Sequence, residues 1–520
     1  MAPELASRAR RAGRAIRYDG LMTVGVYHPP PCRRRRRGAP AAQAARAARA
    51  AQTLAAALAL AAVLAAAPAR LMAADPHDHE VPEIGDPSYS ALSLADEKKL
   101  GRAILAQLRA SLPVTGDIEV QDYLQALGTR LLSQDADNRI DFHFLPVADR
   151  AINAFATPGG VVVINEGLML FAGNESELAG VVAHEIAHVT RRHIARLRAE
   201  MRTTSWLSAL LLVAGLMASS YNPELSQLAV HVGATLPIEQ QLSYSRSLEY
   251  EADRSAIRLM SAARINPRGV SRFFAKLQAR EGRRQTPEFL RTHPLTIGRL
   301  RNAEARASRY PENLHLDSKA FRHIKARLLA LKNLDPAPDE PETASLRLYR
   351  KGVSLTRRLP GEAIQAFEQI PEQERGLPVM LALSQAHIAQ GDDLKASQYL
   401  AELNELHPGR ASINYYLAGC LLRTGEAHRA LEHLRKIKSL HRYHPQLYKL
   451  SAEAATAAGR ESLGHEYLAD YYTASAHFNL ALRQLNLAER APGASRGARE
   501  RIKRKRDEIT NFQQEFKSRL

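Results

Sequence analysis

The sequence predicts an α+β domain followed by an all-α solenoid of helical repeats. In the first part, stretches of alternating apolar residues and a Pro-Gly-Gly turn lie among amphipathic helical segments, which is typical of an α+β domain. In the second part, Gly391, Gly425 and Gly459 recur at a spacing of 34 residues, and a fixed period of this length indicates stacked helical pairs. A stretch rich in proline and acidic residues, 334–343, is the expected linker between the two parts.

The N-terminal 74 residues differ in composition from the rest of the chain. They carry thirteen arginines against two acidic residues, a net charge of +11 out of the total of +18. An apolar Ala/Leu run over 54–67 and small residues up to Ala74 follow, an order typical of an export signal. We expect cleavage near Ala74, with retention as a membrane anchor as the alternative and Met22 as an alternative start. Because most of the basic charge lies in this segment, it does not indicate a nucleic-acid partner.

The expected α+β domain covers residues 94–333, after a polar tail over 75–93. Helical periodicity predicts helices over the segments 94–108, 121–132, 242–259 and 268–280. Alternation predicts a strand over 140–147 and a hairpin formed by 151–155 and 161–164. A further helix, capped by Asn174 and Glu177, is expected to run to about residue 200. The apolar run 206–218 is interpreted as a buried helix or flap, with a membrane-contacting surface as the alternative.

The 34-residue period is that of tetratricopeptide repeats, in which a glycine lies at the turn between two paired helices. Ala396 and Ala430 repeat the same interval and can pack the second helix of each pair. We therefore expect a tetratricopeptide-repeat domain over 344–490, with a groove suited to peptides or partner proteins, and a basic helix over 491–520. The basic helix is interpreted as solvated, with peripheral membrane contact as the alternative.

The segment His184-Glu185-Ile186-Ala187-His188 carries the strongest chemical signal. Two histidines four residues apart on a helix lie on one face and can bind a single ion at about 2.0 Å. Glu185 then projects beside the metal, where it can accept a proton from bound water. The pattern predicts one zinc ion per chain and a hydrolytic use of Glu185.

Zinc needs a third protein ligand, and two places can supply one. His193 is the nearest histidine, but it is rotated off the metal-facing side of its helix, and we expect it on a solvated surface. Glu249 and Asp253 lie one turn apart on a downstream helix. One carboxylate can complete the tetrahedron while the other orients a ligand imidazole, with Glu251 as an alternative ligand.

Four motifs together resemble those of a known family: NAFATPGG at 153–160, HEIAH at 184–188, EYEAD at 249–253 and THPLTIGRL at 292–300. The chain resembles the metallopeptidase family that includes the CAAX prenyl endopeptidase and the heat-shock protease HtpX. The resemblance implies a gluzincin-type zinc metallopeptidase domain. Its implied site residues are the zinc ligands His184, His188 and Glu249, the catalytic base Glu185, and Asp253 as a support behind the ligands.

The resemblance also implies two roles around the metal. His293 matches a family histidine close to zinc, either as an inhibitory fourth ligand or as a donor in the transition state; a turn histidine without a role is the third possibility. An edge strand that includes Asn153, Ala154 and Phe155 is expected to pair with the substrate backbone.

As a cellular role, the resemblance implies that of a periplasmic zinc endopeptidase that degrades misassembled outer-membrane proteins and assists their assembly. The implied partners are unfolded or misassembled substrates and, through the repeats, the outer-membrane assembly machinery. The alternative is a repeat-based chaperone or adaptor whose metal site is structural or vestigial.

Overall fold

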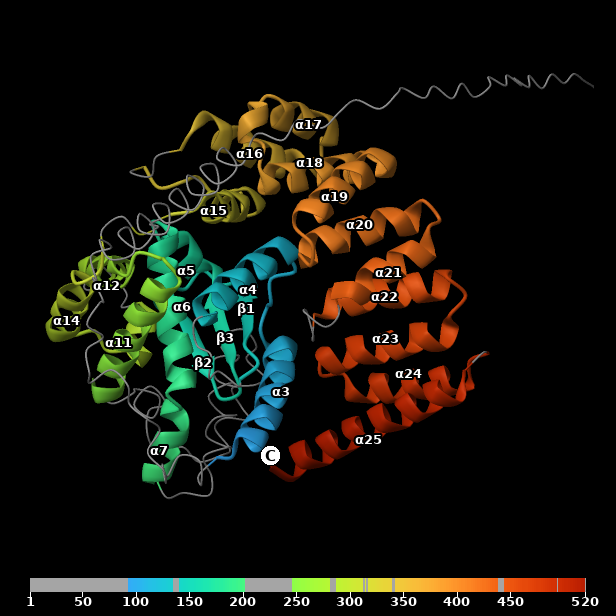
Figure 1. Cartoon of the computed structure of the whole chain (residues 1–520), viewed down its shortest axis with the longest axis horizontal. Coiled ribbons are helices and arrows are strands. Elements are labelled where there is room, and N and C mark those ends of the chain that lie inside the picture. The colour runs from blue at the N-terminus through green and yellow to red at the C-terminus, as the bar shows by residue number, and fades with distance from the viewer. Residues whose placement is uncertain are drawn as a thin grey trace, which may run out of the picture. The chain divides into compact units, whose positions relative to one another are not determined.

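The computed structural model describes residues 92–133, 140–201, 246–280, 287–311, 314, 317–338, 342–437, 444–492 and 494–519 (Figure 1). All of them belong to one compact unit, Ile84–Leu520. The expected export signal, most of the polar tail and the apolar run 206–218 lie outside the described residues. Within the described residues, no helix combines the length and the apolar character needed to cross a membrane.

A three-stranded sheet forms the middle layer of the N-terminal part (Figure 1). Its strands are β1 (His143–Val147), β2 (Ala154–Thr157) and β3 (Val161–Asn165). β3 pairs parallel to β1 and antiparallel to β2, so the order β1-β3-β2 makes β2 an edge strand. The predicted hairpin is confirmed, although its first strand begins at Ala154 and not at residue 151.

Helices surround this sheet. They are α3 (Leu94–Ser111), α4 (Ile118–Leu132), α5 (Glu166–Phe171), α6 (Glu175–Thr190), α7 (His193–Met201), α11 (Arg246–Ala262), α12 (Arg268–Arg280), α13 (Glu288–Thr292), α14 (Ile297–Ala307) and α15 (Lys319–Leu331). Side chains of β3 alternate between the two faces. Val161 and Val163 pack against α3, whereas Val162 and Ile164 face the cluster built by α4 and α6. The sheet is therefore buried on both faces, and α6 runs through the core.

The hairpin turn lies directly against α3. Gly159 has a positive φ of 78°, and a Cβ added to Gly101 of α3 would come within 2.7 Å of the Gly159 Cα. A side chain at either position would push the two backbones apart, because contacts under 3.0 Å cannot be accommodated between backbones. The two glycines therefore allow the hairpin that carries the edge strand to pack closely against α3.

The helix predicted from Asn174 to about residue 200 begins as expected. The Asn174 side chain accepts from the Glu177 N–H at 3.0 Å. Its predicted end is wrong, because α6 stops at Thr190 and a turn separates it from α7. At the turn, Arg192 adopts a left-handed φ of 53° and its buried guanidinium pairs with Glu97 of α3 at 2.9 Å. A tertiary ion pair therefore overrides the local helical propensity.

The C-terminal part consists of helices in antiparallel succession, each packed on the next (Figure 1). They are α16 (Ala344–Leu355), α17 (Pro360–Glu368), α18 (Leu377–Gln390), α19 (Asp393–Leu406), α20 (Ala411–Arg423), α21 (Ala427–Ile437), α22 (Pro445–Ala457), α23 (Glu461–Ala474), α24 (Phe478–Arg490) and α25 (Arg496–Arg519). Gly391, Gly425 and Gly459 lie just after α18, α20 and α22, with φ values of 87°, 85° and 70°. The 34-residue glycine spacing thus marks three equivalent left-handed turns.

The two parts share buried contacts along α4. Ile118 belongs to the apolar cluster of the C-terminal helices, and Asp122 accepts from the Ser412 hydroxyl at 2.7 Å. Arg327 of α15, which pairs with Asp117 at 2.7 Å and with Glu119 at 3.0 Å, also donates to Gln385 of α18 at 3.0 Å. The C-terminal helices are therefore packed onto the N-terminal part and are not a loosely tethered appendage.

Candidate metal centre

Helix α6 supplies His184, Glu185 and His188, each only 1% exposed. The two histidines are one turn apart, and their Nε2 atoms face each other at 3.0 Å. The helix packs against α11, α12 and β2, which places these polar side chains in the core. Two facing imidazole nitrogens in an apolar interior need a proton or a cation between them.

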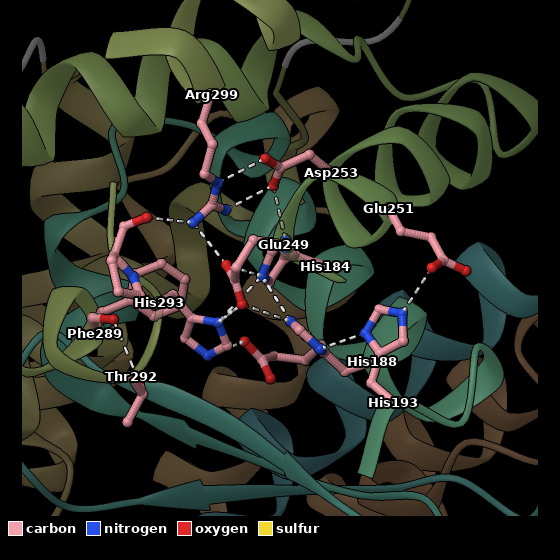
Figure 2. A network of polar contacts seen from close by, with 12 residues as sticks. His184, His188, His193, Glu249, Glu251, Asp253, Phe289, Thr292, His293 and Arg299 are labelled. Atoms are coloured by element: carbon pink, nitrogen blue, oxygen red, sulfur yellow. Dashed lines mark hydrogen bonds and ion pairs between the residues drawn. The ribbon is translucent and has the colours of Figure 1, made fainter. Parts of the chain in front are cut away.

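Helix α11 brings two carboxylates to these histidines (Figure 2). Glu249 Oε2 lies 3.5 Å from His184 Nε2, and Glu249 Oε1 lies 3.4 Å from His188 Nε2. Asp253, one turn further, places Oδ1 3.0 Å from the other nitrogen of His184, Nδ1. Glu251 points elsewhere, toward His193 and Arg196. The geometry therefore favours Glu249 over Glu251 as the carboxylate that faces the cluster.

His293 completes the cluster from the end of α13. Its Nδ1 lies 3.0 Å from Glu249 Oε1 and 3.3 Å from His184 Nε2, while its Nε2 lies 3.4 Å from Glu185 Oε1. The ring stacks on Phe289, with centroids 4.7 Å apart. His293 is 1% exposed, so it is not a turn histidine in solvent.

The four facing groups match the chemistry of a metal site. The ligand atoms of His184, His188, Glu249 and His293 all lie within 4.8 Å of one another. Ligands of a tetrahedral zinc ion at 2.0–2.2 Å are separated from each other by about 3.3 to 3.5 Å. Five of the six pairs of groups are separated by 3.0–3.5 Å, close to that spacing, so the residues fit one divalent ion.

A buried arginine that the sequence did not single out lies behind the cluster. Arg299 of α14, 1% exposed, donates through two nitrogens to Asp253 at 2.8 Å each. A third nitrogen lies 2.6 Å from Glu249 Oε2 and donates to the Pro294 carbonyl at 3.0 Å. Arg299 thus locks both carboxylates in place. It lies within the quoted 292–300 motif, but an arginine on a helix is ordinarily at the surface.

Burial and pairing set the charges of the ligands. Burial alone would raise the pKa of Glu249, but His293, His184 and His188 hold it well below its ordinary value. Burial lowers the pKa of His188 well below its usual range. For His184, burial also acts to lower the pKa, but Asp253 and Glu249 outweigh it and raise it to about 9, so a metal would displace a proton there. Burial raises the pKa of Glu185, which suits a group that accepts a proton.

The prediction that His193 lies on a solvated surface is wrong. Its side chain is fully buried, and its Nδ1 lies 2.8 Å from Nδ1 of His188. The turn at Arg192 redirects the chain, so that the first residue of α7 comes to lie behind the second histidine of α6. The expectation assumed one continuous helix, in which residues five apart diverge.

The fold and this site define a metallopeptidase. Residues 119–307 match the model of peptidase family M48, and the facing residues of the cluster lie within that range. The match supports the family that the sequence motifs indicated.

Individual proteins that are similar to this chain are also named as proteases. It is 28% identical over 467 residues to the beta-barrel assembly-enhancing protease of Escherichia coli, covering 87% of this chain and 94% of that protein. A Vibrio cholerae protein provisionally given the same name is 37% identical over 270 residues, 51% of this chain and 55% of that protein. The mitochondrial metalloendopeptidase OMA1 of Schizosaccharomyces pombe is 31% identical over 183 residues, 35% of this chain and 51% of that protein.

Proposed function

We propose that the protein is a zinc-dependent endopeptidase in which His184, His188 and Glu249 bind the metal. The observation that carries the proposal is the convergence of three imidazoles and one carboxylate from α6, α11 and the end of α13. Nitrogen and carboxylate ligands in tetrahedral spacing are those that zinc prefers. When bound, zinc would polarise the scissile carbonyl and lower the pKa of a water molecule.

We assign separate roles in the reaction to Glu185, Asp253 and Arg299. Glu185, next to the first ligand on α6, takes a proton from the attacking water and passes it to the leaving amine. Asp253 accepts from Nδ1 of His184, which fixes that imidazole with Nε2 toward the metal position. Arg299 holds Asp253 through two hydrogen bonds and keeps it ionised. These contacts leave Glu185 as the group whose task is proton transfer.

The edge strand β2 supports a substrate-binding role. The Asn153 carbonyl accepts from the Asn165 N–H at 3.1 Å, which places this pair in hydrogen-bonded register with β3. Because backbone groups alternate along an antiparallel strand, those of Ala154 and Ala156 point away from β3. We propose that an extended substrate adds to this edge, beside Glu185, as a further strand.

The proposed cellular role rests on the relatives' names. The Escherichia coli relative is named for beta-barrel assembly, so we propose that this chain acts in the periplasm on misassembled outer-membrane proteins. The C-terminal helices, proposed to be tetratricopeptide repeats, would contact the outer-membrane assembly machinery. The equivalent glycine turns and the buried Ala396 and Ala430 support the repeat assignment.

A chaperone or adaptor with a structural metal is the second candidate. One observation favours it: with His293 in place, four protein groups face one point, and closed four-ligand sites are typically structural. Glu185 argues against this reading, since a structural site needs no base. If His293 is a fourth ligand, the endopeptidase function therefore requires that His293 can move away from the metal position.

Metal removal and restoration test the proposal. The purified protein should cleave an unfolded protein, lose this activity on treatment with a chelator, and regain it with one equivalent of zinc. The exposed Glu304→Gln change on α14 serves as a control that should behave as wild type. A metal-loaded protein that binds unfolded chains without cleaving any would favour the adaptor.

A further inference from the structure

Each of the two α6 histidines has a second ring nitrogen that faces away from the metal position, and the two are supported differently. His184 Nδ1 faces the carboxylate of Asp253 at 3.0 Å. His188 Nδ1 faces another imidazole, that of His193, at 2.8 Å. Figure 2 shows His193 on the side of His188 opposite to His184 and Glu249. His193 is fully buried, and nothing in the proposed mechanism uses it.

The direction of the hydrogen bond follows from ligation. A neutral imidazole that offers its Nε2 lone pair to a metal carries its hydrogen on Nδ1. His188 therefore donates to Nδ1 of His193, which is left with its own hydrogen on Nε2. That nitrogen faces Glu251 Oε2 at 3.5 Å, and Glu251 also accepts from Arg196 at 2.9 Å. The contacts form a chain from His188 through His193 to a carboxylate near the surface.

The backbone is shaped to make this contact. In a continuous helix His193 would lie about 140° around the axis from His188. The left-handed turn at Arg192 brings it back, and the buried pair between Arg192 and Glu97 of α3 holds the turn at 2.9 Å. A positive φ in a residue with a side chain is unfavourable unless its surroundings fix it. The strained turn at Arg192 is thus maintained by its ion pair, and it is this turn that brings His193 next to His188.

We propose that His193 is a positioning residue for the metal centre, which accepts the Nδ1 proton of His188 and holds that imidazole at the angle needed for binding through Nε2. Glu251 in turn fixes the ring of His193. The inference rests on the metal site proposed above. It assigns to Glu251 a role behind a ligand and not as a ligand, consistent with its contacts to His193 and Arg196.

Two substitutions at the same position separate acceptor chemistry from packing. His193→Leu fills similar space but offers no acceptor. In His193→Asn, the amide oxygen can take the place of Nδ1 as the acceptor. Removing a hydrogen-bond partner of a ligand histidine typically weakens metal binding about 10-fold to 100-fold. We expect such a loss for His193→Leu and a loss of less than about threefold for His193→Asn.

The experiment measures zinc affinity of the full chain by competition with a chelator, and the absorption spectrum of the cobalt-substituted protein. His387→Leu, which replaces another buried histidine in α18, is the control and should bind zinc as wild type does. The cobalt spectrum should change in His193→Leu and remain close to wild type in His193→Asn. Thermal unfolding of the metal-free proteins should differ little between the two variants.

The outcomes that overturn the inference are distinct from those that overturn the metal site. Wild-type affinity in His193→Leu, or equal losses in both variants, would show that the acceptor does not matter. Should His193→Leu not fold, Glu251→Ala decides: a several-fold weaker affinity supports the chain of contacts, and unchanged affinity contradicts it. A wild-type protein that binds no zinc would instead remove the proposed function itself.

Discussion

Nδ1 of His293 lies 3.0 Å from Oε1 of Glu249, closer than either α6 histidine approaches that carboxylate. With zinc bound as proposed, His293 would face the position that a catalytic water needs. The inhibitory role proposed for His293 then requires that it move away for activity. Its short helix α13 and its stacking on Phe289 are the contacts that hold it.

His293→Ala should open the site. X-ray absorption of the zinc-loaded wild type should show three imidazole nitrogens, and the variant should show two. The variant should also cleave bystander proteins more readily, because water can reach the vacated position. Two nitrogens in the wild type together with a less active variant would instead assign His293 the role of a transition-state donor.

Asn153→Ala should weaken the hold on His293. The Asn153 side chain donates to Glu288 of α13 at 3.3 Å, and the Phe289 N–H donates to the Ile152 carbonyl at 3.2 Å. These two bonds connect the start of the edge strand to the helix that ends at His293. Basal cleavage should rise in the variant, but by less than in His293→Ala. Measured rates equal to wild type would show that this link does not restrain α13.

Glu249→Ala should remove most of the metal, because the carboxylate faces all three imidazoles of the cluster. Zinc content after dialysis is the measurement, with Glu251→Ala as the comparison. Glu249→Ala should be nearly zinc-free, whereas Glu251→Ala should retain zinc at reduced affinity. The reverse order would make Glu251 the third ligand.

Arg327→Met should destabilise the whole described fold. Arg327 is 5% exposed and pairs with Asp117, the N-cap of α4, and with Glu119 of α4, so its loss leaves a buried and a largely buried carboxylate without their cation. The expected cost is about 3–5 kcal/mol in the free energy of unfolding. Arg322→Met on the same helix is the matched control, because Arg322 forms a half-exposed pair with Asp317 worth at most about 1 kcal/mol. Denaturant titration compares the two, and equal effects would show that the α4 interface contributes little.

The helical spacing of the candidate ligands could be predicted because it depends on local geometry, whereas the choice of Glu249 came from the resemblance of the EYEAD segment to a family motif. His184 and His188, like Glu249 and Asp253, are one helical turn apart, and this spacing survives whatever the tertiary structure does. The repeat turns could be predicted for the same reason, since each needs a residue that tolerates a left-handed φ.

His193 and Arg299 could not be predicted because their positions depend on distant residues. His193 reaches His188 only through the turn at Arg192, and Glu97 in another helix fixes that turn. Arg299 is buried only because Asp253 and Glu249 neutralise it. The packing of α4 on the C-terminal helices depends likewise on pairs hundreds of residues apart, such as Asp122 with Ser412.

The most direct test of the account is Glu185→Gln, measured for zinc content and for hydrolysis of an unfolded protein in the same preparation. The substitution leaves His184, His188 and Glu249 untouched and removes only the proton acceptor. We predict one zinc per chain, as in wild type, and a rate of hydrolysis lower by at least about 100-fold. A pure preparation of this variant that holds zinc and cleaves at the wild-type rate would contradict the account.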